Sequence, residues 1–242
     1  MGKQRLQILS SKDSWISSPQ VRLALSWLYG TPPIWKTRLN TEANLIPNAP
    51  ITDREISEGL WALKPFKAPG PDGLHAGFFQ HFWLIVGDSV REKVKGVFSS
   101  GVIPDYINQT LITLIPKCRS PESLSNYQPI SLCNTIYKIV TKIILNWIRP
   151  FLSGLISPLQ AAFVPGRKGL DNAIIVQELI HTMSKKKGRT GVMAIKLDLE
   201  KAYDRLEWSF IRDTLNLFNF PDHLISLIMS CVSTTFISIL FN

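Results

Sequence analysis

The chain has 242 residues, 45% of them hydrophobic and 19% charged, so it is long and apolar enough to fold around a sizeable core. Its formal net charge of +9 at pH 7 favours a polyanionic partner, with nucleic acid ahead of a membrane surface. The three cysteines are odd in number and widely spaced, which gives no disulfide framework and indicates an intracellular setting, nucleus or cytoplasm.

Residues 1–50 predict an irregular segment, because prolines at five positions interrupt any long pattern. The first clear helix is expected to start at Thr52. Thr52 and Glu55 have the spacing of a capping box, and Ile51 is placed to staple the helix entry. Pro65 ends this segment.

A turn-rich loop with a lysine at its start follows the first helix. Its sequence over residues 67–73 is KAPGPDG, and proline and glycine at these positions favour tight turns. A second helical region is expected over residues 76–99, where apolar residues recur at helical spacing. Strands are then predicted at residues 110–115 and 129–132, and the polar segment between them indicates an extended hairpin.

A long helix is expected next, with apolar residues on one face over residues 136–148 and its end at Pro150. A further helix is predicted over residues 171–183. It is followed by a basic loop, whose charged residues are Lys185, Lys186, Lys187 and Arg189. Helices resume near Ser209. Residues 224–241 carry no charge, but their period changes from helical to alternating, so a helix followed by a strand is expected and not a membrane span.

Between the basic loop and these last helices, residues 192–199 predict a strand that delivers a carboxylate to its end. Lys196 and Asp198 share one face of this strand, so Asp198 emerges where a hard cation such as Mg2+ can be bound through oxygen. The alternative is that Asp198 or Glu200 only caps the next helix. The histidines show no metal-binding spacing, and neither a GxSxG motif nor a P-loop occurs, so hydrolase and NTPase functions find no support.

Five motifs occur in order along the chain. They are KAPGPDG at 67–73, NYQPISL at 126–132, FVPGR at 163–167, DN at 171–172 and KLDLEKAYDRLEW at 196–208. Together they resemble the reverse transcriptase of LINE-type, non-LTR retrotransposons, most of all the plant elements, over about residues 50–242. The resemblance implies a helix-rich α+β fold with a short antiparallel sheet. Right-hand polymerase fingers would occupy residues 51–190 and an incomplete palm residues 191–242, after the irregular segment 1–50.

The resemblance places the reaction chemistry around Asp198. Asp198 corresponds to the first metal-binding, catalytic aspartate of the palm, and the carbonyl of Leu199 to a ligand of the second metal. Two Mg2+ ions would hold the attacking 3′ oxygen and the leaving pyrophosphate. Tyr203 corresponds to the gate that favours dNTPs over ribonucleotides, and a plain core aromatic is the alternative for it.

The resemblance also places the triphosphate of the dNTP at the predicted hairpin. Lys117 and Gln128 correspond to a lysine and an arginine that hold it. Gln128 can donate a hydrogen bond but lacks the charge and the rigid fork of arginine, so weakened nucleotide binding is expected. For Lys117 the alternative is an ordinary solvated lysine.

Lys67, Arg167 and Asn172 are expected near the nucleic acid, an RNA template with its DNA primer. The alternative for Lys67 and its loop is a purely structural connection between two helices. Arg167 and Asn172 either contact the template or pin the fingers to the palm. The basic loop at residues 185–189 either grips a phosphate backbone or is simply solvated.

Part of the family's site is not found in this sequence. Two-metal chemistry needs more than one carboxylate, and in the family the others are an adjacent Asp-Asp pair in a later palm hairpin. None of the ten aspartates here neighbours another. The chain is therefore expected to be a fragment, either a truncated RNA-directed DNA polymerase or a non-catalytic RNA- or DNA-binding remnant. In an unstable fragment, residues 236–240 would leave an unpaired strand edge.

The first prediction follows from this count of carboxylates. The purified 242-residue chain is expected not to extend a DNA primer on an RNA template in Mg2+, because Asp198 alone cannot hold two metal ions. Gel analysis of a labelled primer measures this directly, with a complete reverse transcriptase as the positive control. Template-dependent extension by the chain would contradict the prediction.

Overall fold

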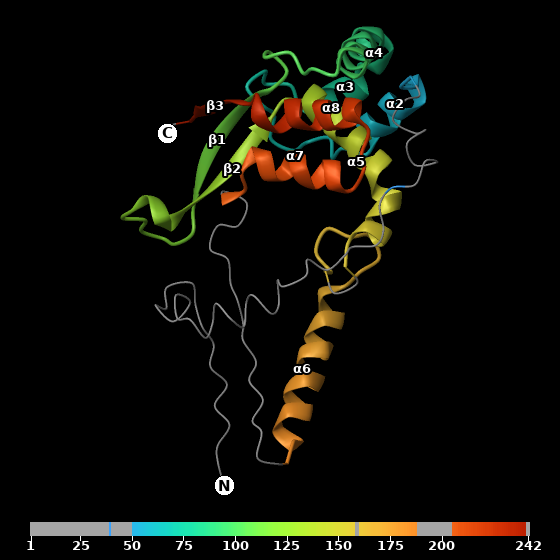
Figure 1. The fold of residues 1–242 in the computed structure, drawn as a ribbon. Helices are drawn as coiled ribbons and strands as arrows, with labels where there is room; N and C mark the ends of the chain where they lie inside the picture. The colour runs from blue at the N-terminus through green and yellow to red at the C-terminus, as the bar shows by residue number, and fades with distance from the viewer. Residues whose placement is uncertain (1–38, 40–49, 158–159, 188–204, 241–242) are drawn as a thin grey trace. The chain divides into compact units, whose positions relative to one another are not determined.

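The structure, a computed structural model, describes residues 39, 50–157, 160–187 and 205–240. Figure 1 shows the fold. The chain divides into two compact units, one comprising Leu39–Phe151 with Trp208–Asn242 and the other Met1–Arg38 with Leu152–Glu207. The first unit combines helices with a three-stranded sheet, which confirms the α+β class. Most of the segment expected to be irregular, residues 1–50, lies outside the described residues.

Helix α2 (Asp53–Trp61) begins at the predicted capping box. The Glu55 N–H donates to the Thr52 hydroxyl at 3.2 Å, and the Thr52 N–H donates to the Glu55 carboxylate at 2.8 Å. The indole N–H of Trp147 donates to the second carboxylate oxygen at 2.7 Å. Burial raises the pKa of Glu55, but the hydrogen bonds from Thr52 and Trp147 outweigh burial and hold the pKa below its usual value. One carboxylate therefore both caps α2 and ties it to the helix that carries Trp147.

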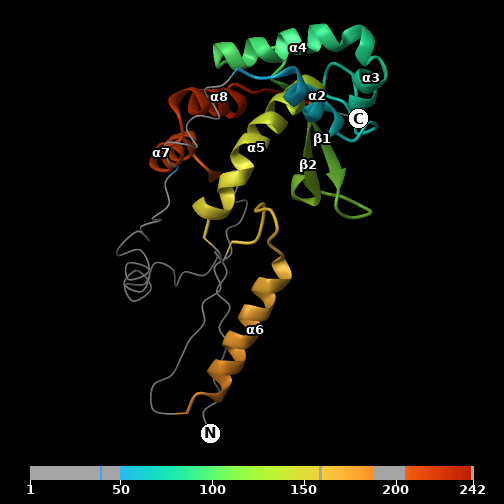
Figure 2. The same cartoon turned by 90° about the vertical axis from the view of Figure 1, so that its right-hand side faces the viewer.

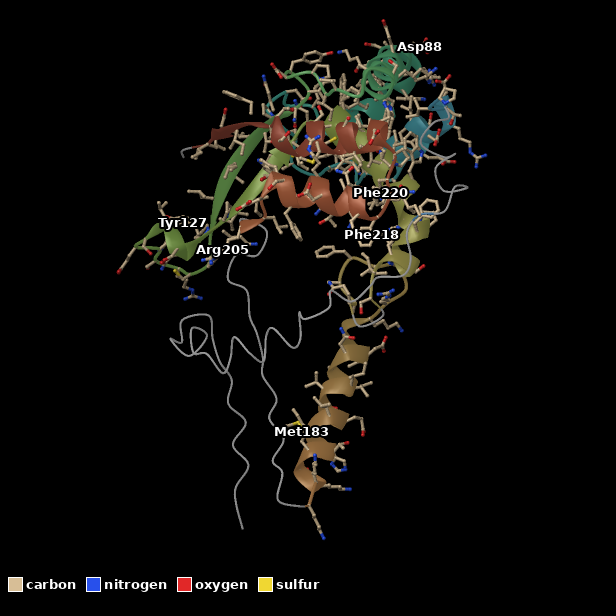
Figure 3. The ribbon with its side chains drawn as sticks, in the orientation of Figure 1. Asp88, Tyr127, Met183, Arg205, Phe218 and Phe220 are labelled. Carbon is tan, nitrogen blue, oxygen red and sulfur yellow. The ribbon has the colours of Figure 1, made fainter. Side chains whose placement is uncertain are left out.

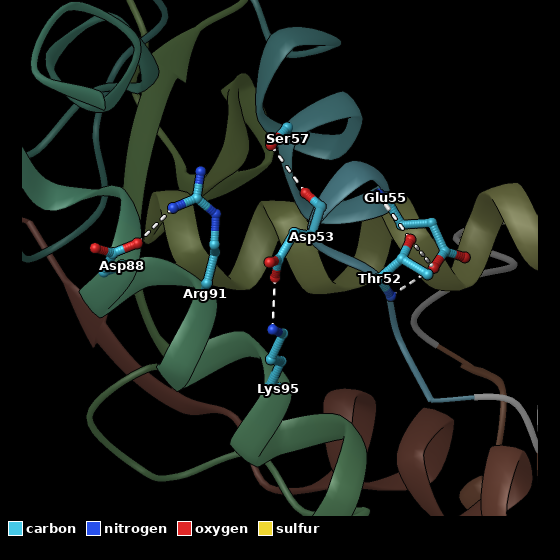
Figure 4. A network of polar contacts seen from close by, with 7 residues as sticks. All are labelled: Thr52, Asp53, Glu55, Ser57, Asp88, Arg91 and Lys95. Carbon is cyan, nitrogen blue, oxygen red and sulfur yellow. Dashed lines mark hydrogen bonds and ion pairs between the residues drawn. The ribbon is translucent and has the colours of Figure 1, made fainter. Parts of the chain in front are cut away.

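An ion pair joins α2 to helix α4 (Trp83–Ser100), as Figure 4 shows. Lys95 Nζ lies 2.6 Å from the Asp53 carboxylate. Within α4, Arg91 lies 2.6 Å from Asp88, and its guanidinium lies 4.7 Å from the centre of the Trp83 ring. The Lys95–Asp53 pair holds α4 against the first turn of α2.

The helical region predicted over residues 76–99 is two helices. Helix α3 (Ala76–His81) ends at Phe82, whose φ of −98° and ψ of 24° leave the helical range, and α4 then begins at Trp83. The break directs Trp83 toward Trp61 of α2, with ring centres 6.1 Å apart. The break therefore lets α4 start in a new direction, with Trp83 beside α2.

The predicted hairpin is confirmed by strands β1 (Gln109–Pro116) and β2 (Tyr127–Cys133), which pair antiparallel. Strand β3 (Phe236–Ile239) pairs with β1 in parallel, so the order is β2-β1-β3. The sheet is thus mixed, and not purely antiparallel as expected. The expectation of an unpaired strand at residues 236–240 is also wrong. Asn108 brings β3 into place, because its carbonyl accepts from the Phe236 N–H at 3.0 Å and its amide donates to Thr234 at 2.9 Å.

Helix α5 (Thr135–Leu155) carries much of the buried core. Ile139 and Ile143 are almost completely buried. A Cβ atom on Gly59 of α2 would lie 3.3 Å from a side-chain carbon of each of these isoleucines. The absence of a side chain at Gly59 therefore allows the close approach of α2 and α5.

The predicted end of this helix at Pro150 is wrong, because α5 continues to Leu155. Proline lacks an N–H, so the carbonyl of Asn146, four residues earlier, loses its helical donor. Both residues are exposed, and water can take the place of the missing donor. On a solvated face the proline costs one hydrogen bond without ending the helix.

The remaining helices agree with the sequence. Helices α7 (Trp208–Leu217) and α8 (Asp222–Ser233) pack side by side, as Figure 2 also shows. The helix-then-strand prediction for residues 224–241 is confirmed by α8 and β3. In the second unit, α6 (Gly169–Lys185) matches the helix predicted over residues 171–183. No helix in the described part of the chain is long and apolar enough to cross a membrane.

The Glu55 contacts generate the second prediction. Glu55→Gln is expected to lower the free energy of unfolding by about 1–2 kcal/mol, because the cap and the charge-assisted bond to Trp147 both weaken. Since folding lowers the Glu55 pKa, its contribution is present above the unfolded pKa, near 4.5, and is lost as pH falls through the folded value. Urea unfolding between pH 7 and pH 3 measures both effects.

Glu58→Gln is the matched control, since Glu58 is more than half exposed and its ion pair with Arg54 lies within the same helix. It is expected to change stability by no more than a few tenths of a kcal/mol. Equal losses for the two variants would contradict the role assigned to Glu55.

Candidate nucleotide and nucleic-acid interface

The residues expected to carry the chemistry lie outside the described part of the chain. Asp198, Leu199 and Tyr203 all fall within residues 188–204, as does the strand predicted over residues 192–199. Among the described residues, no group of three or more His, Cys, Asp or Glu side chains could hold a metal ion. The role of Asp198 in metal binding therefore stays a prediction.

The hairpin brings Lys117 and Gln128 to the same end of the sheet. Gln128 pairs directly with Ile115, and Lys117 lies two residues beyond Ile115, just after the end of β1. The Lys117 N–H donates to the Asn126 carbonyl at 2.8 Å, so Lys117 stands opposite Asn126, two residues before Gln128. The register therefore places the two residues close together in the outer part of the hairpin.

The outer end of the hairpin is a short, internally bonded turn. Its 3-10 helix η3 (Leu124–Asn126) leads directly into Tyr127, which Figure 3 labels. The Lys117 ammonium donates to the Ser125 carbonyl at 3.3 Å, and the Asn126 amide donates to the Cys118 sulfur at 3.4 Å. These bonds cross from one arm to the other, so they hold the two arms in register where Lys117 leaves the sheet.

The loop at residues 67–73 is docked on Asn134. The Asn134 side-chain oxygen accepts from the Asp72 N–H at 3.2 Å. A Cβ atom on Gly70 would lie 2.4 Å from both that oxygen and the Asn134 backbone nitrogen, so only glycine fits there. Gly73 closes the turn with φ of 71° and an N–H that donates to Gly70 at 3.0 Å. The loop thus has a structural role, and Lys67 projects from this fixed backbone.

Asn134 and its neighbour Thr135 were not predicted as site residues. The Asn134 amide nitrogen donates to the carbonyls of Tyr106 and Ile107 at 3.2 and 3.4 Å, and the Thr135 hydroxyl donates to the Leu74 carbonyl at 2.7 Å. Both side chains are almost fully buried. The available signal was a pair of polar residues between an apolar strand and an apolar helix, but their partners are 27 to 62 residues distant in sequence.

Arg167 caps the end of α5. Its guanidinium donates to the carbonyls of Ser153 and Ile156, both at 3.0 Å, to Gln160 at 2.8 Å, and to Ser157. A positive charge at the carboxyl end of a helix is favourable both for the unpaired carbonyls and for the helix dipole. The arginine of the FVPGR motif therefore holds the chain together after α5, and its expected contact with the template remains a prediction.

Asn172 lies in the first turn of α6, and the basic residues Lys185–Lys187 lie at the other end of this helix. All four belong to the second unit, whereas Lys67, Lys117 and Gln128 belong to the first. The structure therefore assembles three of the predicted binding residues within one unit. The roles of Asn172 and of the basic loop stay predictions.

Comparison with known proteins identifies the family. The model of the family described as reverse transcriptase (RNA-dependent DNA polymerase) matches residues 115–241, which is more than half of the chain. The chain belongs to the reverse transcriptase family. The matched residues of this reverse transcriptase region run from the hairpin through Arg167 to β3, and the loop at residues 67–73 precedes them.

The relatives are proteins of retrotransposable elements. The chain is 35% identical over 173 residues to the transposon TX1 uncharacterized 149 kDa protein of Xenopus laevis, covering 71% of this chain and 13% of that protein. It is 27% identical to the Pol polyprotein of the type-2 element R2DM of Drosophila melanogaster, covering 71% and 15%, respectively. A type-1 element R1 polyprotein of Bradysia coprophila is 24% identical over 163 residues, 64% of this chain and 15% of that protein.

These matches confirm the predicted resemblance to the reverse transcriptase of LINE-type, non-LTR elements. The reverse transcriptase chain spans only 13% to 15% of the length of these three relatives. All three come from animals, so they do not bear on the expected likeness to plant elements.

The third prediction tests Asn134. Asn134→Ala is expected to lower the free energy of unfolding by about 1–3 kcal/mol, because it leaves the buried partners of the Asn134 amide without hydrogen bonds. Thermal and urea unfolding measure this loss. Asn146→Ala, on the exposed face of α5, the helix that follows Asn134, is the control and is expected to be nearly neutral. A neutral Asn134→Ala would show that the loop at residues 67–73 does not depend on this side chain.

Proposed function

We propose that the retroelement protein represented by this chain adds dNTPs to a DNA 3′ end on an RNA template, and that this chain contributes the fingers hairpin that holds the triphosphate. The observation that carries the proposal is the position of Lys117 and Gln128 at the outer end of the β1–β2 hairpin, where Lys117 stands opposite Asn126 and Gln128 lies two residues farther along. Membership of the reverse transcriptase family suggests the reaction, and the hairpin offers a position where the negatively charged triphosphate can bind.

Lys117 suits a triphosphate because the residue is exposed and its ammonium makes a long hydrogen bond, 3.3 Å, to the Ser125 carbonyl. A bond from an ammonium to a phosphate oxygen is roughly twice as strong as a bond between neutral groups. Gln128 adds a neutral donor beside it. Arg119, two residues farther along the turn, is also exposed and adds positive charge to the same end of the hairpin.

The proposal includes a divalent metal ion, which we assign to Asp198. A carboxylate at the end of a strand suits a divalent cation of the Mg2+ type, and the adjacent Leu199 carbonyl is an oxygen ligand of the kind that such ions accept. When bound, such ions stabilise the negative charge on the phosphates during transfer. Tyr203 is assigned to the sugar of the incoming nucleotide. The strand pattern and the motif support these assignments.

The fourth prediction tests the hairpin by crosslinking labelled dTTP to the full chain, with oligo(dT) annealed to poly(rA) and Mg2+ present. Lys117→Gln is expected to reduce the crosslink at least tenfold, because the loss of a charge-assisted bond is worth about 1.5–3 kcal/mol. Gln128→Arg is expected to increase it by a similar factor, since arginine adds a charge and a two-pronged donor.

Gln109→Arg is the matched control for added charge. Gln109 is the first residue of β1, at the end of the hairpin opposite to Lys117 and Gln128. It is expected to leave the dTTP crosslink unchanged. An equal response of Gln109→Arg and Gln128→Arg would mean that net charge, and not the hairpin, attracts the nucleotide, and the proposal would then fail.

A non-catalytic RNA- or DNA-binding role is the second candidate, and the net charge of +9 favours it. The two candidates differ in their response to nucleotide. A binding remnant retains RNA in a salt-sensitive manner but shows no dTTP crosslink that depends on Lys117 and Gln128. The crosslink therefore separates a nucleotide-holding hairpin from a general affinity for polyanions.

A further inference from the structure

A small pocket lies between the end of α2, the loop at residues 67–73 and the start of α5. Its volume is about 150 Å³. Three lysines contribute to its wall, and small or apolar residues supply the remainder; its lining consists of Leu63, Lys64, Lys67, Ala76, Thr135 and Lys138. All of these residues belong to the same compact unit. The chain thus builds one concave site from three separate segments.

The charge of this pocket is one-sided. Three lysines line it, no Asp or Glu does, and none of the ion pairs found among the described residues involves Lys64, Lys67 or Lys138. Three lysines without a nearby carboxylate in the lining give the pocket a positive potential, which favours an anion. The start of α5 adds to the effect, because Thr135 lies at the positive end of a helix dipole.

The lysines stand on ordered backbone. Lys138 donates to the Ala68 carbonyl at 3.3 Å, and Asn134 and Thr135 hold residues 72 and 74 on either side of the turn. Arrangement before binding matters because less side-chain and loop entropy is then lost when a ligand is held. This site therefore differs from lysines scattered on a surface.

The size of the pocket limits what enters it. Pockets for complete small molecules measure roughly 300–1,000 Å³, so a volume of about 150 Å³ suits a single phosphate and its sugar edge better than a nucleotide. The aliphatic stems of the lysines and the side chains of Leu63 and Ala76 offer an apolar wall to the sugar.

The pocket is separate from the hairpin site. Gln128 and Asn134 lie six residues apart along β2 and its end, which corresponds to about 20 Å of extended chain at about 3.3 Å per residue. A single triphosphate cannot reach from Lys117 and Gln128 to Lys138. An anion in the pocket is therefore a different phosphate from those of the incoming nucleotide.

We propose that Lys64, Lys67 and Lys138 bind a backbone phosphate of a single-stranded nucleic acid. This inference rests on the proposed function for the class of partner. The lysines contact phosphate and not base edges, so the site contributes affinity and position without sequence preference. Lys64 and Lys138 are thereby added to Lys67 as binding residues.

The fifth prediction measures binding of a fluorescent 12-nucleotide RNA to the full chain as salt is varied. Each lysine that neutralises a phosphate contributes about 0.7 to the slope of log K against log salt for a single strand. Each of Lys64→Gln, Lys67→Gln and Lys138→Gln is expected to reduce the slope by about this amount. Binding at about 0.1 M salt then weakens about fivefold per lysine, which is a slope of 0.7 over a tenfold range of salt.

Lys142→Gln and Lys93→Gln are the matched controls, because they remove the same charge from α5 and α4 without lining the pocket. They are expected to leave the slope unchanged, and an RNA of different sequence is expected to give the same result. Thermal unfolding of every variant checks that the fold is retained, and the exposed or half-exposed positions of the three lysines favour this.

Two outcomes would overturn the inference. One is a slope for the pocket variants equal to that of the controls, with the dTTP crosslink at the hairpin intact, which leaves the proposed function standing. The other is stabilisation by inorganic phosphate that depends on the three lysines while RNA binding does not, which makes the pocket a site for free phosphate. Loss of the hairpin crosslink with lysine-dependent RNA binding would instead contradict the proposed function and leave the pocket supported.

Discussion

The arrangement of the first unit depends on one buried amide, that of Asn134. It stands between the end of β2 and the start of α5, and each of its polar atoms bonds to backbone from another segment. A buried amide can do this because it presents an acceptor and two donors in one plane. Leaving any of these partners unpaired in the interior costs free energy, so the loop, the hairpin and the helix are held in one arrangement.

Asn108 plays a matching role at the same end of the hairpin. Its side-chain amide contacts the last turn of α8, and its backbone carbonyl accepts from the first residue of β3. The two asparagines therefore both stand at the base of the hairpin, one at the entry to β1 and the other at the exit from β2. Because β1 is the central strand, fixing these two points fixes the direction of the hairpin, and with it the place where Lys117 and Gln128 are presented.

The sequence was sufficient where the signal is local. The capping box of Thr52 and Glu55 and the period of the hairpin strands depend on neighbours within a few residues, and the structure has both. The sequence was insufficient where a distant partner decides. The break at Phe82 comes with a contact between Trp83 and Trp61, β3 finds β1 through Asn108, and the helix passes Pro150 because that face is solvated.

The same distinction applies to the candidate site. Lys117 and Gln128 were identified through the motif, and the register of the hairpin brings them together. Arg167 was identified by the same route, yet its guanidinium is occupied by four carbonyls after α5, which a motif does not reveal. Asn134 carries more of the geometry than Lys67 does, but a single asparagine after a strand has no distinctive pattern in a sequence.

The ion pairs show which of the basic side chains in the first unit are already neutralised. Pairing with Asp53 and Asp88 uses the charges of Lys95 and Arg91 on the side where α4 meets α2. The lysines of the pocket and the hairpin have no such ion pairs among the described residues. The proposed nucleic-acid partner would therefore follow the path along β2 from the hairpin to the start of α5. This path is about 20 Å long, which is longer than one nucleotide. A path of this length suits a nucleic-acid strand, whereas a free triphosphate would occupy only part of it.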